Sequence, residues 1–199
     1  MTSETETKAK VGLRKYQRTV VPLMIVSITI TIVLLTMALF DKLPWTTTIE
    51  NYTKTFSLEK RLIFTIQLLF IDCFTLLFAI FAVIARRVTS AAINPLDPKA
   101  QVLVEQRQRI LQNTLEQLVV KVILSFTLCT VLQSNELILL PVFTFLFIFG
   151  RLTFALGYPK YRSFGFLMNL SSTIFIVGLI SYRLFISGII FQHMKNKTK

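Results

Sequence analysis

The sequence predicts an all-α integral membrane protein with five membrane-spanning helices. Hydrophobic residues make up 53% of the 199-residue chain, and its mean hydropathy of +0.64 lies far above that of a water-soluble domain. The apolar residues come in blocks of about 20, the number that a helix needs to cross roughly 30 Å of hydrocarbon. Within lipid the backbone amides of such blocks must bond internally, so we expect helices.

Five blocks are long enough to span a membrane: Val20–Phe40, Leu62–Ala85, Thr114–Gln133, Leu137–Leu156 and Phe166–Ile190. The first follows a basic stretch, but its apolar run is too long for a signal peptide and no small-residue cleavage site follows, so we interpret it as a retained anchor. The predicted organisation is a basic tail (1–19), an extra helix with an outer loop (20–61), a four-helix domain (62–190) and a second basic tail (191–199).

The connections between the spans are short. Asp97 is a suitable N-cap and Pro98 a suitable first helical residue, so we expect a long helix that runs from there into the third span without a hinge. Tight links at Ser134–Glu136 and near Pro159–Ser163 leave no room for a separate soluble domain. The fold is therefore a small helical bundle.

The distribution of Lys and Arg predicts the orientation. If the N-terminus is cytosolic, the cytosolic side carries the larger share of the basic residues, which places the C-terminus in the lumen. The sequon at Asn51 then lies in an outer loop, where it can be glycosylated. The tail from Lys195 to Lys199 resembles a cytosolic dilysine signal and also contains a lumenal-type sequon at Asn196. Both cannot act in one topology, and the charge distribution favours the lumenal side.

The net charge of +12 does not indicate a nucleic-acid-binding protein, because the basic residues lie at span ends rather than on one folded face. Anionic membrane lipids are the expected counter-charge. The two cysteines, Cys73 and Cys129, lie in different spans at unequal depth, and His193 is the only histidine. We therefore expect neither a disulfide nor a metal site.

Polar residues form a stripe where the third span begins. At 100° per residue, Arg109, Asn113 and Glu116 fall at about 0°, 40° and −20° on one helical face. Charged groups at this depth are costly unless they face a protein interior or a water-filled cavity, which predicts an internal polar site. The alternative is that Arg109 and Glu116 pair with each other or extend to headgroups, and so only fix helix packing.

A second stripe lies at the same boundary in the fourth span, where Arg151, Phe154 and Tyr158 share a face. Arginine offers a planar fork for a carboxylate, and tyrosine offers a hydroxyl donor. Tyr158 alone is equally typical of an interfacial anchor. Together the stripes predict a site for an anionic, peptide-like ligand from the cytosol, with a lipophilic small molecule arriving through the bilayer.

Two charged residues lie deep within spans, Asp72 in the second and Lys121 in the third. Their similar depth predicts an intramembrane ion pair between neighbouring helices. The alternative is a protonated Asp72 and a Lys121 that extends toward the interface.

The residues of both stripes resemble the MAPEG family, the membrane-associated proteins in eicosanoid and glutathione metabolism. RILQNTLE, from Arg109 to Glu116, resembles the signature of the family's second helix, and FGRLTFALGYPKYR, from Phe149 to Arg162, is similar to its third. Ala85-Arg86-Arg87 resembles the basic end of its first helix. The extra first span is similar to a five-span branch, the mattrin or transmembrane protein 79-like branch.

The resemblance implies a homotrimer in an endomembrane such as the endoplasmic reticulum, with glutathione as cofactor between neighbouring subunits. The implied cofactor-binding residues are Arg109, Asn113, Glu116, Arg151, Tyr158 and Arg86. The family's thiolate-stabilising arginine lies at the start of the last helix, and here the only catalytic candidate is Arg162, which falls earlier than that position. Gln117 and Phe154 also replace a tyrosine and a histidine of some members.

Two functions are therefore compatible with the sequence. One is a binding or regulatory protein that acts through membrane-protein partners in trafficking or receptor processing. The other is a glutathione transferase, peroxidase or eicosanoid-type isomerase that acts on a lipophilic electrophile. The displaced arginine favours the first.

Overall fold

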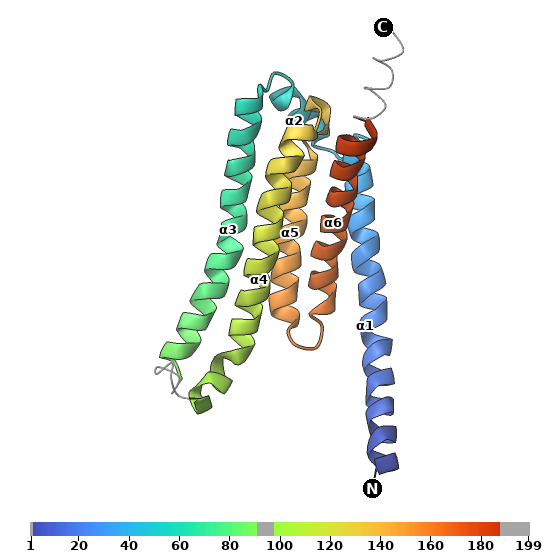
Figure 1. Cartoon of the computed structure of the whole chain (residues 1–199), viewed down its shortest axis with the longest axis vertical. Helices are drawn as coiled ribbons and strands as arrows, with labels where there is room; N and C mark the ends of the chain where they lie inside the picture. Colours follow the sequence, from blue (N-terminus) through green and yellow to red (C-terminus); the bar gives the residue numbers. More distant parts are fainter. Residues whose placement is uncertain (1, 91–97, 188–199) are drawn as a thin grey trace.

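The computed structural model of the chain describes residues 2–90 and 98–187, and every regular element in these ranges is a helix. The elements are α1 (Thr2–Leu39), α2 (Thr46–Thr53), α3 (Leu58–Val88), α4 (Pro98–Val131), the 3-10 helix η1 (Ser134–Glu136), α5 (Leu139–Gly157), α6 (Ser163–Ser181) and the π-helix η2 (Tyr182–Ser187), which continues α6 (Figure 1). Within α1, α3, α4, α5 and the α6–η2 unit are five segments long and apolar enough to cross a membrane. The predicted fold class is confirmed.

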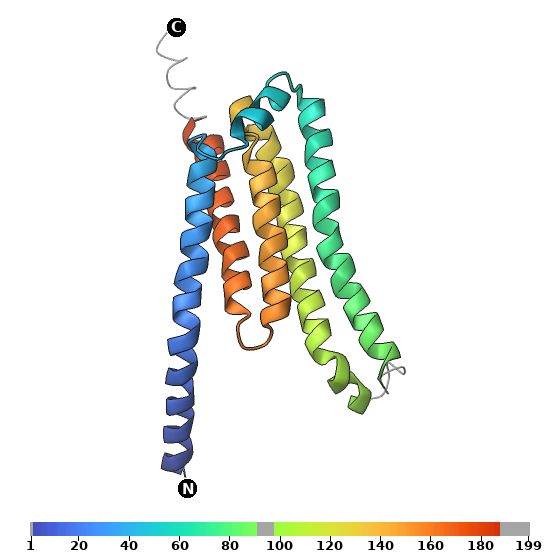
Figure 2. The same ribbon diagram turned by 180° about the vertical axis from the view of Figure 1, so that it is seen from behind.

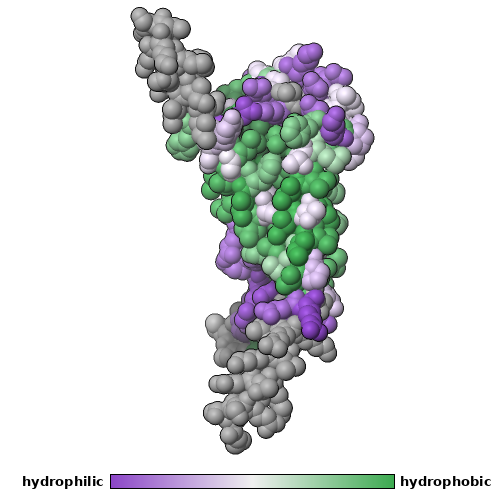
Figure 3. Space-filling view, turned by 90° about the vertical axis from the view of Figure 1, so that its right-hand side faces the viewer, coloured by the Kyte–Doolittle hydropathy of each residue, from purple (hydrophilic) through white to green (hydrophobic). Residues whose placement is uncertain are grey.

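The long helices form a bundle with α5 near its centre (Figures 1 and 2). α3 and α4 pack together on one side of α5, whereas α6 and then α1 lie on the other. The start of α1, the end of α3, the start of α4 and the α5–α6 turn lie at one end, which we call the N-terminal end. α2, η1 and η2 lie at the opposite end. The face in Figure 3 has an apolar band between polar ends, as a membrane requires.

The predicted spans correspond to helices, but the helix ends differ. α1 continues upstream to Thr2, and Asp41, with a φ of 53°, lies in the turn that follows it. α3 begins at Leu58 rather than Leu62, because Ser57 is its N-cap and accepts a hydrogen bond from the Lys60 amide. α4 is the long uninterrupted helix that the sequence predicts. Asp97, its predicted N-cap, and both C-terminal tail motifs lie outside the described residues.

α2 was not predicted, because its eight mainly polar residues have no apolar face that the sequence could reveal. Contacts with residues that are distant in sequence but lie at the same end of the bundle hold it in place. The Thr53 hydroxyl donates a 3.2 Å hydrogen bond to the Ser134 carbonyl. Nearby, Arg61 donates to the Leu132 carbonyl at 2.6 Å and to the Ser134 hydroxyl at 2.8 Å. Glu136 also pairs with Arg183, which joins η1 to η2.

The main apolar core lies toward this opposite end. It is built by α1, α4, the segment that follows η1, α5 and α6, with Leu35, Leu128, Leu137, Leu146 and Ile176 fully buried. Toward the N-terminal end the helices separate enough to leave clefts between them, and these clefts contain the polar stripes.

Candidate functional site

A cleft of about 360 Å³ opens at the N-terminal end between α4, α5 and α6. Its lining consists of Arg109, Asn113, Phe154, Tyr158, Arg162, Ser163 and Phe166. We call it the polar cleft. It brings together residues of both predicted stripes with Arg162 at the start of α6, so side chains about 50 residues apart in the chain face one space.

The Arg109 side chain is exposed and pairs with Glu105 rather than with Glu116. Its Nε and Nη2 atoms lie 3.1 and 2.6 Å from Glu105 Oε1, one turn earlier on α4. An exposed pair of this kind contributes little to stability. Since Glu105 is an easily displaced partner, the Arg109 guanidinium can turn to an anionic ligand.

Glu116 does not line the polar cleft. It accepts a 2.8 Å hydrogen bond from Gln112 Nε2 and lies in a shallow depression on the exposed face of α4. Arg109 and Asn113 line both the depression and the polar cleft. Glu116 is therefore at the outer rim of the site.

Arg151 lies behind the cleft and is only 3% exposed. Its Nη1 atom donates a 2.7 Å hydrogen bond to Asn113 Oδ1. With its amide oxygen turned toward Arg151, Asn169 of α6 accepts from Nη2 at 2.8 Å and from Nε at 2.5 Å, and its nitrogen donates to the Leu146 carbonyl. Because arginine only donates, Asn113 must present its oxygen to Arg151. The amide NH₂ of Asn113 can therefore donate a hydrogen bond to a ligand.

Two glycines let α5 and α6 approach closely beside the site. A Cβ atom at Gly165 would collide with the α5 backbone at Gly150 and Phe154, and a Cβ atom at Gly150 would collide with the Asn169 amide. A larger residue at either position would push apart α5 and α6, which form two walls of the cleft. Gly165, within Phe164-Gly165-Phe166, thus allows α6 to pack close to α5 beside the cleft.

Arg162 reaches the cleft although it falls earlier in the sequence than the MAPEG pattern implies. Its Cζ atom lies 5.4 Å from the centroid of the Tyr158 ring. Ser163 and Phe166 also line the cleft but were not predicted. Their position in the first turn of the last span could have indicated a place in the site, because the first turn of a helix carries free N–H groups that can bind a ligand.

Arg86 lies outside the cleft. It is exposed, and its Nε atom donates a 3.3 Å hydrogen bond to the Leu103 carbonyl, which joins α3 to α4.

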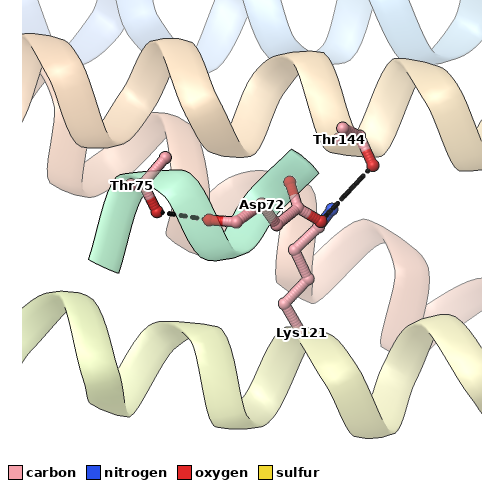
Figure 4. Close-up of polar contacts among 4 residues, drawn as sticks. All are labelled: Asp72, Thr75, Lys121 and Thr144. Carbon is pink, nitrogen blue, oxygen red and sulfur yellow. Dashed lines mark hydrogen bonds and ion pairs between the residues drawn. The ribbon is translucent and has the colours of Figure 1, made fainter. Parts of the chain in front are cut away.

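Asp72 of α3 and Lys121 of α4 form an ion pair inside the bundle (Figure 4), and neither residue lines the polar cleft. Lys121 Nζ lies 2.6 Å from Asp72 Oδ2 and donates a 3.0 Å hydrogen bond to Thr144 Oγ1. The ammonium also lies 4.6 Å from the centroid of the Phe143 ring. Within the described ranges Asp72 Oδ1 has no hydrogen-bond partner. The pair joins α3, α4 and α5 in a fully buried environment.

The polar cleft combines two guanidinium groups, amide and hydroxyl donors, and three aromatic rings. This set can bind an anion that also carries amide groups. Among the described residues no cluster of His, Cys, Asp or Glu could hold a metal ion. Fold and site together define a multi-pass α-helical membrane protein with a cationic cleft at one membrane boundary.

Comparison of the sequence with known protein families narrows this class to one family. Residues 65–182, more than half of the chain, match the MAPEG family, so the chain belongs to this family. The match begins within α3 and ends at the start of η2, which leaves α1 and α2 outside it. No curated protein and no solved structure matched the chain.

Proposed function

We propose that this protein binds glutathione, or a closely similar peptide-like anion, in the polar cleft. The observation that carries the proposal is the convergence of Arg109, Asn113, Tyr158 and Arg162 on one cleft at the membrane boundary. MAPEG membership supports the choice of ligand.

The chemistry of the lining fits glutathione, which at neutral pH carries two carboxylates, one ammonium group and two amides. Arg109 and Arg162 provide cations for the carboxylates. The Asn113 NH₂ group and the Ser163 hydroxyl provide donors for amide carbonyls. Glu116, which lines the neighbouring depression, would accept hydrogen bonds from the ammonium group. Arg151 acts indirectly, by orienting Asn113.

A binding or regulatory role is favoured over strong catalysis. In the segment Phe164-Gly165-Phe166-Leu167, where the family pattern implies a thiolate-stabilising cation, this chain has none. α1 lies outside the family match and packs along α6, which supports a five-span, mattrin-like branch that acts in membrane trafficking or receptor processing. In such a role, ligand binding would alter contacts with membrane-protein partners.

One observation favours the alternative, a glutathione transferase, peroxidase or eicosanoid-type isomerase. Arg162 lines the polar cleft in spite of its early sequence position. A guanidinium beside the glutathione sulfur would stabilise the thiolate, which is the nucleophile that attacks a lipophilic electrophile.

We further propose a homotrimer in the endoplasmic reticulum or another endomembrane, with the N-terminal end of the bundle in the cytosol. The exposed row of Glu105, Gln112 and Glu116 on α4 supports self-association, because polar groups within a span are costly when they face lipid. A neighbouring subunit would cover this row and close the polar cleft. The η2 end would then lie in the lumen, as the odd number of spans requires.

The test is glutathione-dependent thermal stabilisation of the purified protein in detergent, followed by an assay of conjugation to a generic electrophile. Ligand at a hundredfold excess over Kd stabilises a protein by about 2.7 kcal/mol. We expect Arg109→Ala to abolish the shift and Lys160→Ala to retain it, because Lys160 lies at the same end but does not line the cleft. Stabilisation without turnover supports binding alone, and turnover lost in Arg162→Ala supports the enzyme. No stabilisation of the wild-type protein would refute the glutathione assignment.

A further inference from the structure

The extra helix α1 contacts the part of the chain that matches the family along α6. The match covers residues 65–182 and leaves α1 outside it, yet α1 and α6 pack side by side (Figure 2). The buried face of α1 includes Ser27, Thr31 and Leu35, which follow one another at intervals of four residues and are 0% exposed. Two of these three side chains carry a hydroxyl group, so their hydrogen bonds show what this face does besides apolar packing.

Ser27 bonds to another helix, whereas the neighbouring hydroxyl of α1 bonds within its own helix. A serine or threonine inside a helix commonly donates to a carbonyl one turn earlier in the same helix. Thr31 does so, at 2.9 Å from the Ser27 carbonyl. The Ser27 hydroxyl instead donates a 2.7 Å hydrogen bond to the carbonyl of Phe164 in α6. Among the described side chains of α1, this is the one hydrogen bond that reaches another helix.

The acceptor of this bond lies in the turn that forms one wall of the polar cleft. Phe164 lies between Ser163 and Phe166, and both of these residues line the cleft together with Arg162. Gly165, in the same turn, packs against the α5 backbone. Both α5 and α1 therefore contact the backbone that carries the cleft residues of α6.

The first turn of α6 has no side-chain cap. Arg162 occupies the N-cap position with an α-helical backbone conformation, and its side chain makes no capping hydrogen bond. A helix start without a capping side chain must be held by other contacts. The bond from Ser27 to Phe164 is such a contact, and it comes from outside the family match.

We propose that Ser27 is a positioning residue of the polar cleft. Through its bond to Phe164, α1 holds the first turn of α6 at a fixed distance from α4. The cleft residues of α6 and those of α4 can then contact one ligand at the same time. The inference rests on the proposed binding of glutathione in the cleft, and it gives the helix outside the family match a role in that binding.

The test measures the glutathione affinity of the full chain in lipid nanodiscs by calorimetry. Ser27→Ala removes the donor but leaves the Phe164 carbonyl bonded within α6, so thermal stability without ligand should stay close to that of the wild type. Glutathione affinity should fall about three- to tenfold, the range that the strength of a hydrogen bond between membrane helices allows. Thr31→Val is the matched control and should keep wild-type affinity, because Thr31 is equally buried but bonds within α1.

A second pair of variants separates the hydroxyl group from packing. Ser27→Thr and Ser27→Val introduce branched side chains of the same size, and only the first keeps a hydroxyl donor. We expect glutathione to bind more tightly to Ser27→Thr than to Ser27→Val, by a factor similar to that for Ser27→Ala. Equal affinity of the two branched variants would overturn the proposal.

Hydrogen–deuterium exchange tests the positioning without a ligand. Peptides that cover residues 162–166 should exchange faster in Ser27→Ala than in the wild type, but no faster in Thr31→Val. Unchanged exchange of these peptides in Ser27→Ala would contradict the proposal even if the affinity falls. If the wild type fails to bind glutathione while Ser27→Ala exchanges faster, the glutathione assignment is refuted, and the role of α1 in positioning this turn is supported.

Discussion

Arg151 of α5 donates a 2.7 Å hydrogen bond to Asn113 of α4, and this contact joins the two polar stripes of the sequence into one site. The bond determines which amide atoms of Asn113 remain available to a ligand in the polar cleft. Because Arg151 is buried without a carboxylate partner in the described part of the chain, its environment consists of amides and aromatic rings. Changes at this contact should affect both stability and anion binding.

Substitutions of Asn113 should separate these two effects. Asn113→Ala removes the hydrogen-bond acceptor of a buried cation, which should destabilise the protein by about 1.5–3 kcal/mol. Asn113→Asp keeps an acceptor and neutralises the guanidinium, so its stability should equal or exceed that of the wild type. The same carboxylate repels an anion, so glutathione affinity should fall about tenfold. Thermal unfolding with and without glutathione measures both the stability and the glutathione affinity of each variant. Unchanged affinity in Asn113→Asp would contradict the proposed role of Asn113.

The contact between Asp72 and Lys121 predicts strong coupling between the two residues. Removing one partner leaves the other as a buried uncompensated charge, so Asp72→Asn and Lys121→Met should each cost about 3–5 kcal/mol. The double variant should cost far less than the sum of the single variants, because no charge remains. Thr144→Val, which removes only one hydrogen bond of Lys121, should cost about 1.5–3 kcal/mol. Additive effects in a double-mutant cycle would exclude a direct interaction.

Much of the fold could be predicted because span length and hydrophobicity are local properties of the sequence. The long helix α4 and the short link at η1 could also be predicted, since caps and turns are encoded by neighbouring residues. α2 could not, because its position depends on hydrogen bonds to residues some 80 positions away. The hydrophobicity that a membrane requires thus makes the spans predictable, but it does not determine how the outer loop with α2 packs on η1.

The candidate site was predictable as a set of residues but not as a set of contacts. The helical stripe places Arg109 on the same face as Asn113, yet Arg109 forms its ion pair with Glu105. The i to i+4 spacing of Glu105 and Arg109 was a signal for this pair. Asn169 gave no such signal, because a single amide in an apolar span has no pattern around it. Its contact with Arg151 depends on the close approach of α5 and α6.

The close packing of α5 and α6 predicts opposite effects at two glycines of α6. Gly165→Ala would place a methyl group against the α5 backbone, so the helices must separate at a cost of about 1–3 kcal/mol. A methyl group at Gly178 would meet no other atom within 4 Å, so Gly178→Ala should stabilise the helix by up to about 1 kcal/mol. Gly165→Ala should also weaken glutathione binding, since Arg162 and Ser163 would move away from α4. Equal thermal stability of the two variants would contradict the packing.

Glycosylation at Asn51 tests the proposed orientation and the docking of α2 together. Asn51 is exposed on α2, whereas Thr53 of the same sequon is fully buried and its hydroxyl donates to the Ile49 and Ser134 carbonyls. We therefore expect a glycan to be added before α2 docks on η1. Glycosidase treatment should shift the wild-type band and the Thr53→Ser band, but not the Asn51→Gln band. Asn51→Gln should keep wild-type thermal stability, while Thr53→Ala, which loses both the glycan and the hydrogen bond to η1, should unfold at a lower temperature. An unshifted wild-type band would argue that this end of the bundle does not face the lumen.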